Sequence, residues 1–339
     1  MADDDVLSRP AGDAAGNASA PAPDAPAAEP AGRCVFQEHW WLDAASPDGW
    51  SAVTEERDGH LLGWLPYAVY RRDGVTWCGL PPLTRLAFPV LDLPAGKYES
   101  LGRAQFHVET ELIRRLPEAS VHEFVLPPDH GNALAWQVLG FEARIQHTFR
   151  IDPGSSDAAM WSELNSKTRN LIRRAQDTLH PTPLDAETFA AQYRANLGAM
   201  VSPAESAAVA RLAAAALARG QGRAVGVADA HGMPHAAALF VWDQRDYYYF
   251  LSTRNAGDAA LGAVDLLVWL GMTDAMARGR RFDFDGVSSA SRLRFLQSFG
   301  GRLAARVVVT RRRLPYEGRL LLRRMRHRLT RPGEREEFP

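Results

Sequence analysis

The stretch from Tyr247 to Thr310 constrains the fold more than any other part of this chain. It begins with the short aromatic run YYYFLST, which is typical of a strand, and passes through a glycine-bearing loop into LLVWLGMTDAMARG. In that second run apolar residues recur at the three-and-four spacing of one helical face. The segments RRFDFDG and RLAARVVVT then predict two more strands, separated by a helix that ends in FLQSFGG. The predicted order is therefore strand, loop, helix, strand, helix, strand.

The loop between the first of these strands and its helix, residues 252–262, has the features of an anion site. The first backbone N–H groups of a helix have no partner inside the helix, and the helix dipole places partial positive charge there. A phosphate is therefore favoured at such a junction. An ordinary connection has the same sequence features, so the loop alone does not decide. The residues expected to hold a phosphate are Ser252, Arg254, Asn255, Gly257 and Gly262.

The segment Arg281 to Gly286 alternates phenylalanine with aspartate and is expected to be a strand that ends in the carboxylate of Asp285. Asp283 is expected to face away from Asp285. On YYYFLS, LLVWLGMTDAMARG, FDFDG and FLQSFGG the chain resembles the C-terminal acyltransferase domain of the FemAB-like and BioF2-like group of the GNAT superfamily. That resemblance implies a donor phosphate at the loop after the fourth strand and acyl transfer at a splay between adjacent strands.

Several roles for single residues follow from the resemblance. Asp285 is expected to orient or deprotonate the acceptor, with Tyr249 as a candidate proton donor, although an aromatic residue in a strand is more often part of the core. Arg292 and Arg294 are candidates for binding a phosphate or an acceptor carboxylate, and a position on the helix surface is the alternative. Members of the group usually carry a lysine in the last helix where this chain has Leu296, which weakens the case for an aminoacyl-tRNA donor. No serine-histidine-aspartate order or G-x-S-x-G elbow is present to supply a covalent nucleophile.

The first part of the chain repeats the predicted order of the second. Asp58-Gly59 and Asp73-Gly74 each separate runs rich in strand formers, and Asp-Gly is a strong signal for a hairpin turn. The endings AWQVLGFEARIQHTFRI and RFLQSFGGRLAARVVVT align with Gly140 and Gly300, which are 160 positions apart (300 − 140). Self-similarity at a long period indicates repeated structural units. The expected fold is α/β (α+β), with tandem GNAT-like domains that each have a mixed, largely antiparallel sheet flanked by helices.

The 339 residues give room for two domains with cores of their own, and a net charge of −1 does not favour general nucleic-acid coating. Residues 1–32 are rich in alanine, proline, aspartate and glycine and are expected to be a disordered tail without a secretory signal. An N-terminal GNAT-like domain is expected over 33–152, a linking helix over 153–180 and the acyltransferase domain over 181–314. The remaining part, 315–339, is expected to be a basic helix and tail.

The linking segment WSELNSKTRNLIRRAQ resembles the helix that joins the domains in FemAB-like proteins. Its apolar residues share one face, which leaves a basic surface. Arg169 and Arg173 are expected to line the cleft between the domains and to bind an anionic substrate, and a solvated helix face is the alternative. The two cysteines lie in no metal-binding or disulfide pattern, so no metal site is expected and a reducing compartment is favoured.

The leading hypothesis is a GNAT-family N-acyltransferase that moves an acyl group from acyl-coenzyme A, acetyl or longer, or from a carrier thioester to an amine acceptor. That acceptor is expected to be a small molecule, a sugar or a cell-envelope or polysaccharide precursor. One alternative is a FemAB-type aminoacyltransferase of peptidoglycan synthesis that uses charged tRNA, and another is a non-catalytic binding protein on the same scaffold. The basic C-terminal helix is a candidate for contact with anionic lipid or tRNA. DNA is not an expected partner, and the expected location is the cytoplasm, including the inner face of the membrane.

Overall fold

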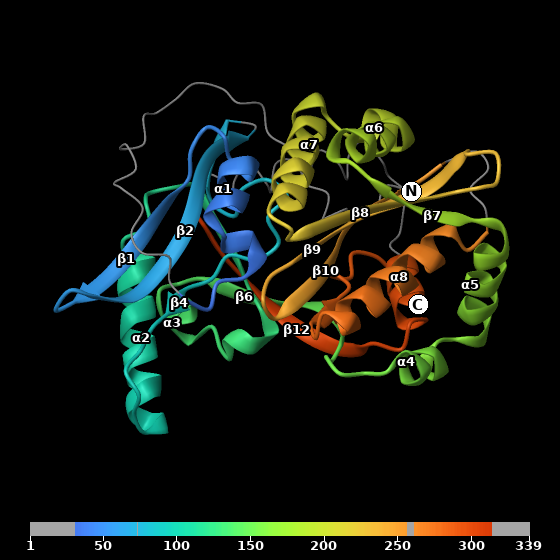
Figure 1. Cartoon of the computed structure of the whole chain (residues 1–339). Coiled ribbons are helices and arrows are strands. Elements are labelled where there is room, and N and C mark those ends of the chain that lie inside the picture. Colours follow the sequence, from blue (N-terminus) through green and yellow to red (C-terminus); the bar gives the residue numbers. More distant parts are fainter. Residues whose placement is uncertain (1–30, 73, 256–260, 314–339) are drawn as a thin grey trace, which may run out of the picture.

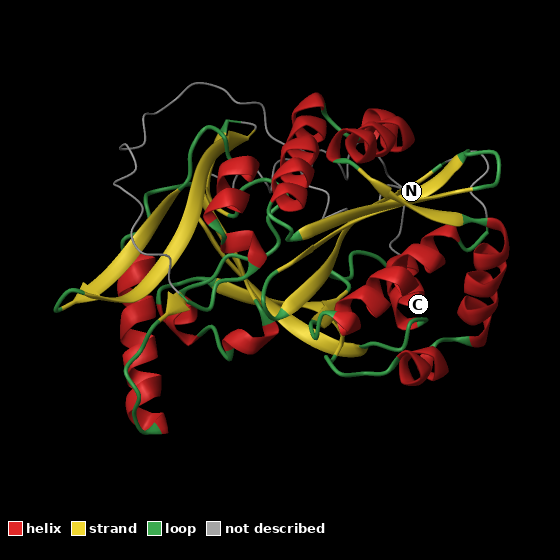
Figure 2. Cartoon of the chain, in the orientation of Figure 1, coloured by secondary structure: helices red, strands yellow, loops and turns green. Residues whose placement is uncertain are grey.

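The computed structural model of the chain describes residues 31–72, 74–255 and 261–313 (Figure 1). Most of the expected N-terminal tail and the expected basic helix over 315–339 lie outside the described residues. Figure 2 shows helices on both faces of a sheet that runs through the whole described chain. The residues before and after Asp152 are called here the first half and the second half.

The strands of the first half are β1 (Ser51–Arg57), β2 (His60–Arg72), β3 (Val75–Gly79), β4 (Val90–Leu91), β5 (Val121–Leu126) and β6 (Glu142–Ile151). Between β1 and β2, Asp58 has φ 52° and Gly59 has φ 77°, so both central residues of this turn are left-handed. The first expected Asp-Gly hairpin is therefore confirmed. Asp73 of the second expected turn lies outside the described residues, but β2 and β3 pair antiparallel on either side of it.

The second half contributes β7 (His180–Leu184), β8 (Gly222–Ala228), β9 (Pro234–Trp242), β10 (Asp246–Arg254), β11 (Arg281–Asp283) and β12 (Arg302–Arg312). These strands and those of the first half form one sheet in the order β1-β2-β3-β5-β12-β6-β11-β10-β9-β8-β7, with β4 beside β2. The parallel neighbours among these strands are β3 with β5 and β10 with β11. The expected mixed, largely antiparallel sheet flanked by helices is confirmed.

The two halves exchange their last strands. β12, the last strand of the second half, pairs antiparallel with β5 of the first half, and β6, the last strand of the first half, pairs antiparallel with β11 of the second. The exchanged strands pair with each other from Arg302↔Arg150 to Thr310↔Glu142. The order β3-β5-β12 on one side of this pair therefore repeats β10-β11-β6 on the other, as the alignment of Gly140 with Gly300 predicts.

The helices lie on both faces of this sheet (Figure 1). They are α1 (His39–Ala45), α2 (Tyr98–Arg114), α3 (Leu134–Val138), α4 (Asp157–Glu163), α5 (Ser166–Thr178), α6 (Ala186–Leu197), α7 (Pro203–Ala218), α8 (Ala263–Ala277) and α9 (Ala290–Gln297). The alternating tyrosines of β10 show the layering. Tyr247 and Tyr249 pack in a core with α5, α8 and α9, whereas Tyr248 and Phe250 pack in a second core with α6 and α7.

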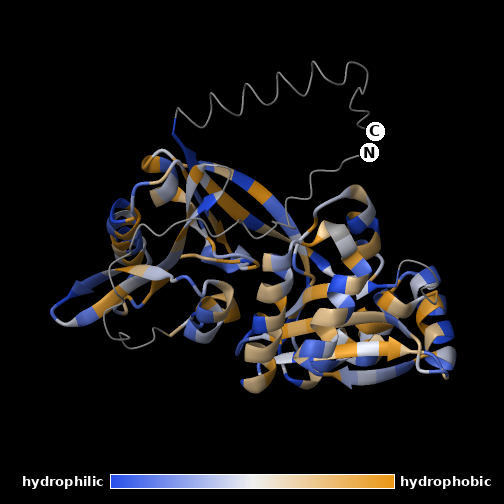
Figure 3. Ribbon diagram, turned by 90° about the horizontal axis from the view of Figure 1, so that it is seen from above, coloured by the Kyte–Doolittle hydropathy of each residue, from blue (hydrophilic) through white to orange (hydrophobic). Residues whose placement is uncertain are grey.

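The second of these cores continues into the first half without a break. Phe36 lies 4.8 Å from the ring of Tyr248, and Trp41 of α1 lies 5.0 Å from the ring of Phe250. All four aromatic side chains are buried. In Figure 3 orange, apolar residues follow many of the strands. The first half is therefore fixed against β10 by aromatic packing as well as by the exchanged strands.

Strand β7 was not expected from the sequence. Its residues HPTPL include two prolines, which lack the N–H that a central strand needs. β7 pairs with β8 alone and forms the edge of the sheet, where proline is tolerated. The strand pattern failed here because an edge strand can keep prolines that would exclude a central one.

The strand exchange predicts that the halves do not fold separately. A fragment of residues 1–152 lacks β12, so β5 would present an unpaired edge and β6 would have neither neighbour. We expect this fragment to lack a cooperative thermal transition, and a mixture with residues 153–339 to give a one-to-one complex on size-exclusion chromatography. A monomeric fragment 1–152 with its own sharp thermal transition, followed by circular dichroism, would contradict this expectation.

Candidate functional site

The candidate site is a splay between β10 and β11. These parallel strands pair from Asp246↔Arg281 to Tyr248↔Asp283, after which β11 ends while β10 continues to Arg254. The register of β10 against β9 also shifts between Tyr249 and Leu251, which marks a β-bulge at the start of the divergence. Among the described residues, β10 has no strand partner on the β11 side beyond Tyr248. The edge of β10 therefore faces no other described strand there, although the Phe250 carbonyl oxygen accepts a hydrogen bond from Arg85.

Asp285 lies at the mouth of this splay in an uncommon backbone conformation. Its φ is 61°, in the left-handed region, and Gly286 follows with φ 94°. A left-handed non-glycine residue costs roughly 1–2 kcal/mol and persists only where its surroundings hold it. Asp285 is 3% exposed, and its carboxylate forms ion pairs with Arg85, at 2.7 Å, and with Arg306, at 3.1 Å.

Arg85 comes from the loop after β3 in the first half and crosses the splay on the face that the first half covers. Besides its ion pair with Asp285, it donates a hydrogen bond to the carbonyl oxygen of Phe250 over 3.4 Å, and its guanidinium lies 5.1 Å from the Phe250 ring. One side chain of the first half therefore joins both diverging strands of the second half.

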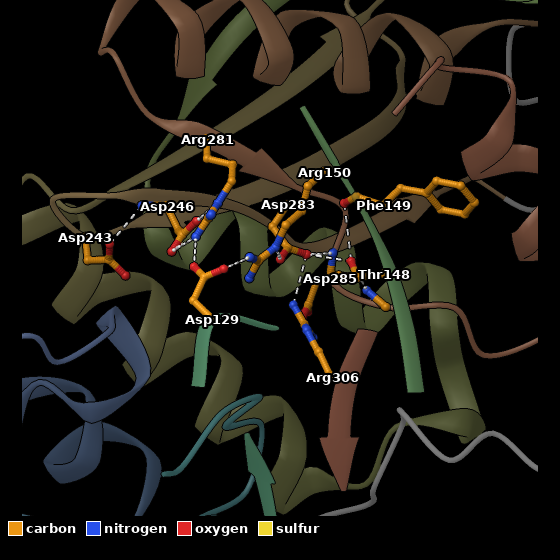
Figure 4. A network of polar contacts seen from close by, with 11 residues as sticks. Asp129, Thr148, Phe149, Arg150, Asp243, Asp246, Arg281, Asp283, Asp285 and Arg306 are labelled. Atoms are coloured by element: carbon orange, nitrogen blue, oxygen red, sulfur yellow. Dashed lines mark hydrogen bonds and ion pairs between the residues drawn. The ribbon is translucent and has the colours of Figure 1, made fainter. Parts of the chain in front are cut away.

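Arg306 of the exchanged strand β12 joins Asp285 to Asp283 (Figure 4). Asp283 also accepts hydrogen bonds from Thr148 Oγ1, at 2.6 Å, and Arg150 Nε, at 2.8 Å, both on β6. Asp283 is fully buried and Arg306 is 1% exposed. Charges this deep are tolerated only when they are paired. Both exchanged strands thus supply the cations and donors that the carboxylates at the end of β11 require.

The two carboxylates differ in their pKa values. Burial alone would raise the pKa of Asp283, but the charges of Arg306 and Arg150 together with its hydrogen bonds outweigh it and hold that pKa below the usual range. For Asp285 burial dominates and raises the pKa, although Arg85 and Arg306 oppose it. Of the two, Asp285 is therefore closer to the basicity that proton transfer near neutral pH requires.

The expectation that Asp283 faces away from Asp285 was wrong. Arg306 contacts both carboxylates, and the backbone N–H of Asp285 donates to the Asp283 side chain over 2.9 Å. Residues two apart in a strand share a face, so the side chains of Asp283 and Asp285 lie on the same side of the chain. The left-handed backbone at Asp285 is compatible with its contact with the Arg306 guanidinium, which Asp283 also contacts. The alternation that buries the phenylalanines thus puts both aspartates on the other face.

On the opposite, helix-covered face of the splay lie Tyr249, Ser252 and Arg292. Tyr249 is buried and forms a side-chain hydrogen bond with Ser252, and burial raises the pKa of its phenol. Arg292 of α9 donates to the carbonyl oxygens of Gly286, at 3.1 Å, and Phe284, at 3.4 Å, and its guanidinium lies 5.8 Å from the Tyr249 ring. Arg292 therefore bridges the two diverging chains, as Arg85 does on the other face.

The predicted phosphate loop is described in part. Gly257 lies outside the described residues, Arg254 is exposed at the end of β10, and the Asn255 N–H donates to the His235 carbonyl oxygen. Gly262 caps α8 with φ 88°, and a Cβ there would lie 2.4 Å from the carbonyl oxygen of Leu171. Only glycine allows α5 to approach this closely.

The first turn of α8 also carries Asp265, whose pKa is raised by burial. A carboxylate at that position interacts with the same helix dipole that would favour a phosphate. An anion at this terminus would therefore have to avoid the Asp265 side chain, which leaves Arg254 and the N-terminal side of the loop as its approach.

The remaining predicted site residues lie elsewhere. α5 packs against α8 at the far end of the second half (Figure 1). There Arg169 donates to the Trp161 and Ser162 carbonyl oxygens, and Arg173 lies over the Trp161 ring. Neither lines the boundary between the halves, so that expectation was wrong, and a role in substrate binding stays a prediction. Arg294 is exposed on α9, on a different side from Arg292.

The sequence analysis missed the cations that hold the site together, Arg85, Arg150 and Arg306. Arg306 interrupts the apolar run RLAARVVVT in a predicted central strand, and Arg150 interrupts HTFRI in another. An arginine inside a central strand must find a buried acid, and FDFDG offers the acids. The arginines in these strands and the aspartates of FDFDG could therefore have been predicted from the sequence to form ion pairs. Arg85 lies in a proline-containing loop and carries no comparable signal.

The described residues contain no group of three or more histidine, cysteine, aspartate or glutamate side chains arranged to hold a metal ion. None of the helices in the described ranges combines the length and the apolar character that crossing a membrane requires. Cys34 and Cys78 are both buried and unpaired.

Comparison with known protein families gives a match to the part of the chain that contains the splay. Residues 162–291, which include the whole splay, match the family model of the acetyltransferase (GNAT) domain. A search of curated protein sequences gave no match.

Among solved structures, FemX superposes with a TM-score of 0.60 at 13% identity, over 81% of this chain and 91% of FemX. The C-terminal domain of a putative lysylphosphatidylglycerol synthetase from Agrobacterium fabrum superposes with a TM-score of 0.51 at 14% identity, over 80% and 86%. At these identities the likeness concerns the fold. The expected resemblance to the GNAT superfamily is confirmed.

The ion pairs of Asp283 predict a pH-dependent stability. Because its pKa is lower in the folded chain than the unfolded value of about 3.9, its contribution is present above about pH 4 and is lost as the pH falls through the folded value. Asp283→Asn should lower the free energy of unfolding by about 3 kcal/mol at neutral pH, measured by urea titration, and by clearly less near pH 3.5.

The matched control for this prediction is Asp152→Asn. Asp152 is largely exposed and lies 3.7 Å from an exposed arginine, Arg302. Exposed pairs contribute little, so this change should stay within about 0.5 kcal/mol at either pH. An Asp283→Asn deficit that is the same at both pH values would show that the carboxylate charge is not what stabilises the strand exchange.

Proposed function

We propose that the protein is an N-acyltransferase that moves an acyl group from a coenzyme A or carrier-protein thioester to an amine, at the splay between β10 and β11. The observation that carries this proposal is the divergence of two parallel strands directly after Tyr248 and Asp283, inside the segment that matches the GNAT domain. A divergence of this kind leaves backbone amides free in a site with little water, where they can stabilise an oxyanion.

The proposed reaction is direct. The amine nitrogen attacks the thioester carbonyl carbon, a C–N bond forms, and the C–S bond breaks with release of the thiol. The amine must be neutral when it attacks, and the proton that it loses passes through a basic group or solvent to the departing sulfur. The chain's part is to align the two substrates and to donate hydrogen bonds to the developing oxyanion from the free edge of β10.

Asp285 is the proposed proton acceptor. Its raised pKa suits that role, and its left-handed backbone is the kind of strain that gathers at active sites. Its carboxylate is paired with Arg85 and Arg306, so an acceptor amine would have to take the place of one guanidinium contact. Tyr249 lies on the other face of the splay and is proposed as the donor of a proton to the leaving sulfur, from the side that Arg292 covers.

Arg85 is a positioning residue in this proposal. It holds the Phe250 carbonyl oxygen and the Asp285 carboxylate at once, so it fixes the width of the splay from the first half. The first half would thereby build one wall of the acceptor site, although the matched GNAT segment lies entirely in the second half.

A non-catalytic binding protein is the second candidate, and particular contacts favour it. Arg292 occupies the splay on the side of α9. Leu296 is fully buried at the position where FemAB-like proteins usually have a lysine. Asp265 lies in the first turn of α8. A chain that had lost donor binding could keep its fold with these side chains in place. Titration with a thioester separates the two candidates.

Arg292 is expected to control entry of the donor. The pantetheine arm must displace its hydrogen bonds to the Gly286 and Phe284 carbonyl oxygens, and hydrogen bonds from a charged donor are worth roughly 1.5–3 kcal/mol each. Arg292→Ala should therefore bind acetyl-coenzyme A about tenfold more tightly than the natural chain, measured by isothermal titration calorimetry.

Arg294→Ala is the control for this measurement, because it removes the same charge from the exposed side of the same helix. Its affinity should match that of the natural chain within about twofold. If acetyl- and long-chain acyl-coenzyme A bind to none of the three proteins, the transferase proposal fails and the binding-protein candidate gains support.

Arg254 is expected to meet the donor phosphates. It is exposed at the end of β10, next to the loop that precedes α8. Arg254→Ala should weaken acyl-coenzyme A binding about three- to tenfold in low salt, and the loss should shrink in high salt because exposed charges are screened. An affinity that is unchanged in Arg254→Ala would place the phosphates elsewhere.

A further inference from the structure

A small cavity lies at the counterpart of the splay in the first half. There β3 and β5 pair in parallel only from Trp77↔Val121 to Gly79↔Glu123, after which the chain leaves β3 as a loop. The cavity of about 40 Å³ opens at this point. The polar residues that line it are Thr84, Arg85, Glu123, Arg144, Gln146 and Arg306. One water needs at least about 10–15 Å³ by the same measure, so the cavity accepts a group of a few atoms.

Three of the polar residues on the wall of this cavity are arginines, namely Arg85, Arg144 and Arg306. Arg306 is 1% exposed, and its two terminal nitrogens are used by Asp283 and Asp285, but its Nε is buried without a hydrogen-bond partner in the described chain. A buried donor left unsatisfied costs roughly 1–3 kcal/mol. A ligand atom that accepts a hydrogen bond at this wall would recover that cost.

Arg144 of β6 stands on the exposed side of the same cavity. It forms no ion pair with any residue in the described ranges, and its pKa is lowered by burial and by the nearby charge of Arg312. Burial and the charge of Arg312 both disfavour the charged form of Arg144, and an anion beside its guanidinium would stabilise that form. Glu123 is the acid on the cavity wall, and Thr84 and Gln146 are neutral hydrogen-bonding groups there.

The cavity is connected to the proposed reaction site by Arg85. Arg85 lines the cavity and also contacts the Phe250 carbonyl oxygen and the Asp285 carboxylate at the splay. A group held in the cavity is therefore separated from the free edge of β10 by one arginine side chain. An acceptor held at one end in the cavity would have to pass the Arg85 side chain for its amine to reach the splay.

We propose that this cavity binds the carboxylate of the amine acceptor, between Arg144 and Arg306, so that the acceptor is an amino acid or a short peptide. The size of the cavity suits a carboxylate, whose two oxygens match the fork of N–H donors that Arg144 presents, while Arg306 offers its Nε–H. The inference rests on the proposed function, because only that function makes an amine at the splay meaningful. The carboxylate site itself can be tested without a donor.

The test is a titration of the full-length chain with acetate, followed by NMR chemical shifts, with acetamide as the neutral probe of the same shape. Acetate should bind the natural chain in the millimolar range, and acetamide should not. In Arg144→Gln the acetate affinity should fall about tenfold, which corresponds to 1.4 kcal/mol. In Arg312→Gln, which removes a nearby charge that does not line the cavity, it should stay within about twofold.

Three results would overturn the inference: equal acetate affinity in the natural chain and Arg144→Gln, equal binding of acetate and acetamide, or tighter binding of inorganic phosphate than of acetate. Thermal unfolding of Arg144→Gln checks that the exposed substitution leaves the fold intact. Absence of acetate binding together with intact acyl-coenzyme A binding would refute this inference alone. Acetate binding without thioester binding would keep the carboxylate site and refute the transferase.

Discussion

The pairing of β6 with β12 is the interaction on which the rest of this structure depends. Each strand belongs to one half of the chain and completes the sheet of the other, so the backbone hydrogen bonds at the centre of the molecule cannot form in either half alone. The aromatic packing of Phe36 and of Trp41 in α1 against β10 adds a second connection. Together they join the two similar halves into one frame.

This frame explains why so many charges are buried beside the splay. Thr148 and Arg150 lie on one exchanged strand, β6, and Arg306 lies on the other, β12. The side chains of all three residues donate hydrogen bonds to the carboxylates at the end of β11. The arginines and hydrogen bonds hold the pKa of Asp283 below its usual range, while burial raises the pKa of Asp285. The same cations that stabilise the strand exchange therefore set the chemistry that the splay can perform.

The sequence predicted the fold well where local patterns decide it. The turn at Asp58-Gly59 and the start of strand β11 follow from short-range rules, although β11 ends at Asp283 and not at Asp285, and the repeat of Gly140 at Gly300 follows from the similarity of the two halves. The sequence-based prediction failed where a strand or a side chain has its partner far away in the sequence. Strands β6 and β12 have the same local sequence pattern whether they are exchanged or pair within their own half. The two prolines of β7 obscured the pattern of an edge strand. The sequence around Arg85 carries no pattern that predicts its ion pair with Asp285. For these the deciding contacts are between residues that are distant in sequence.

The central claim is that the acyl donor lies in the splay between β10 and the chain after β11. A crystal structure with a non-hydrolysable acetyl-coenzyme A analogue tests it most directly. The account predicts the carbonyl of the analogue against the backbone of β10 beyond Tyr248, with the Arg292 guanidinium moved away from the Gly286 and Phe284 carbonyl oxygens. An analogue bound elsewhere, with Arg292 still in its hydrogen bonds, would contradict it.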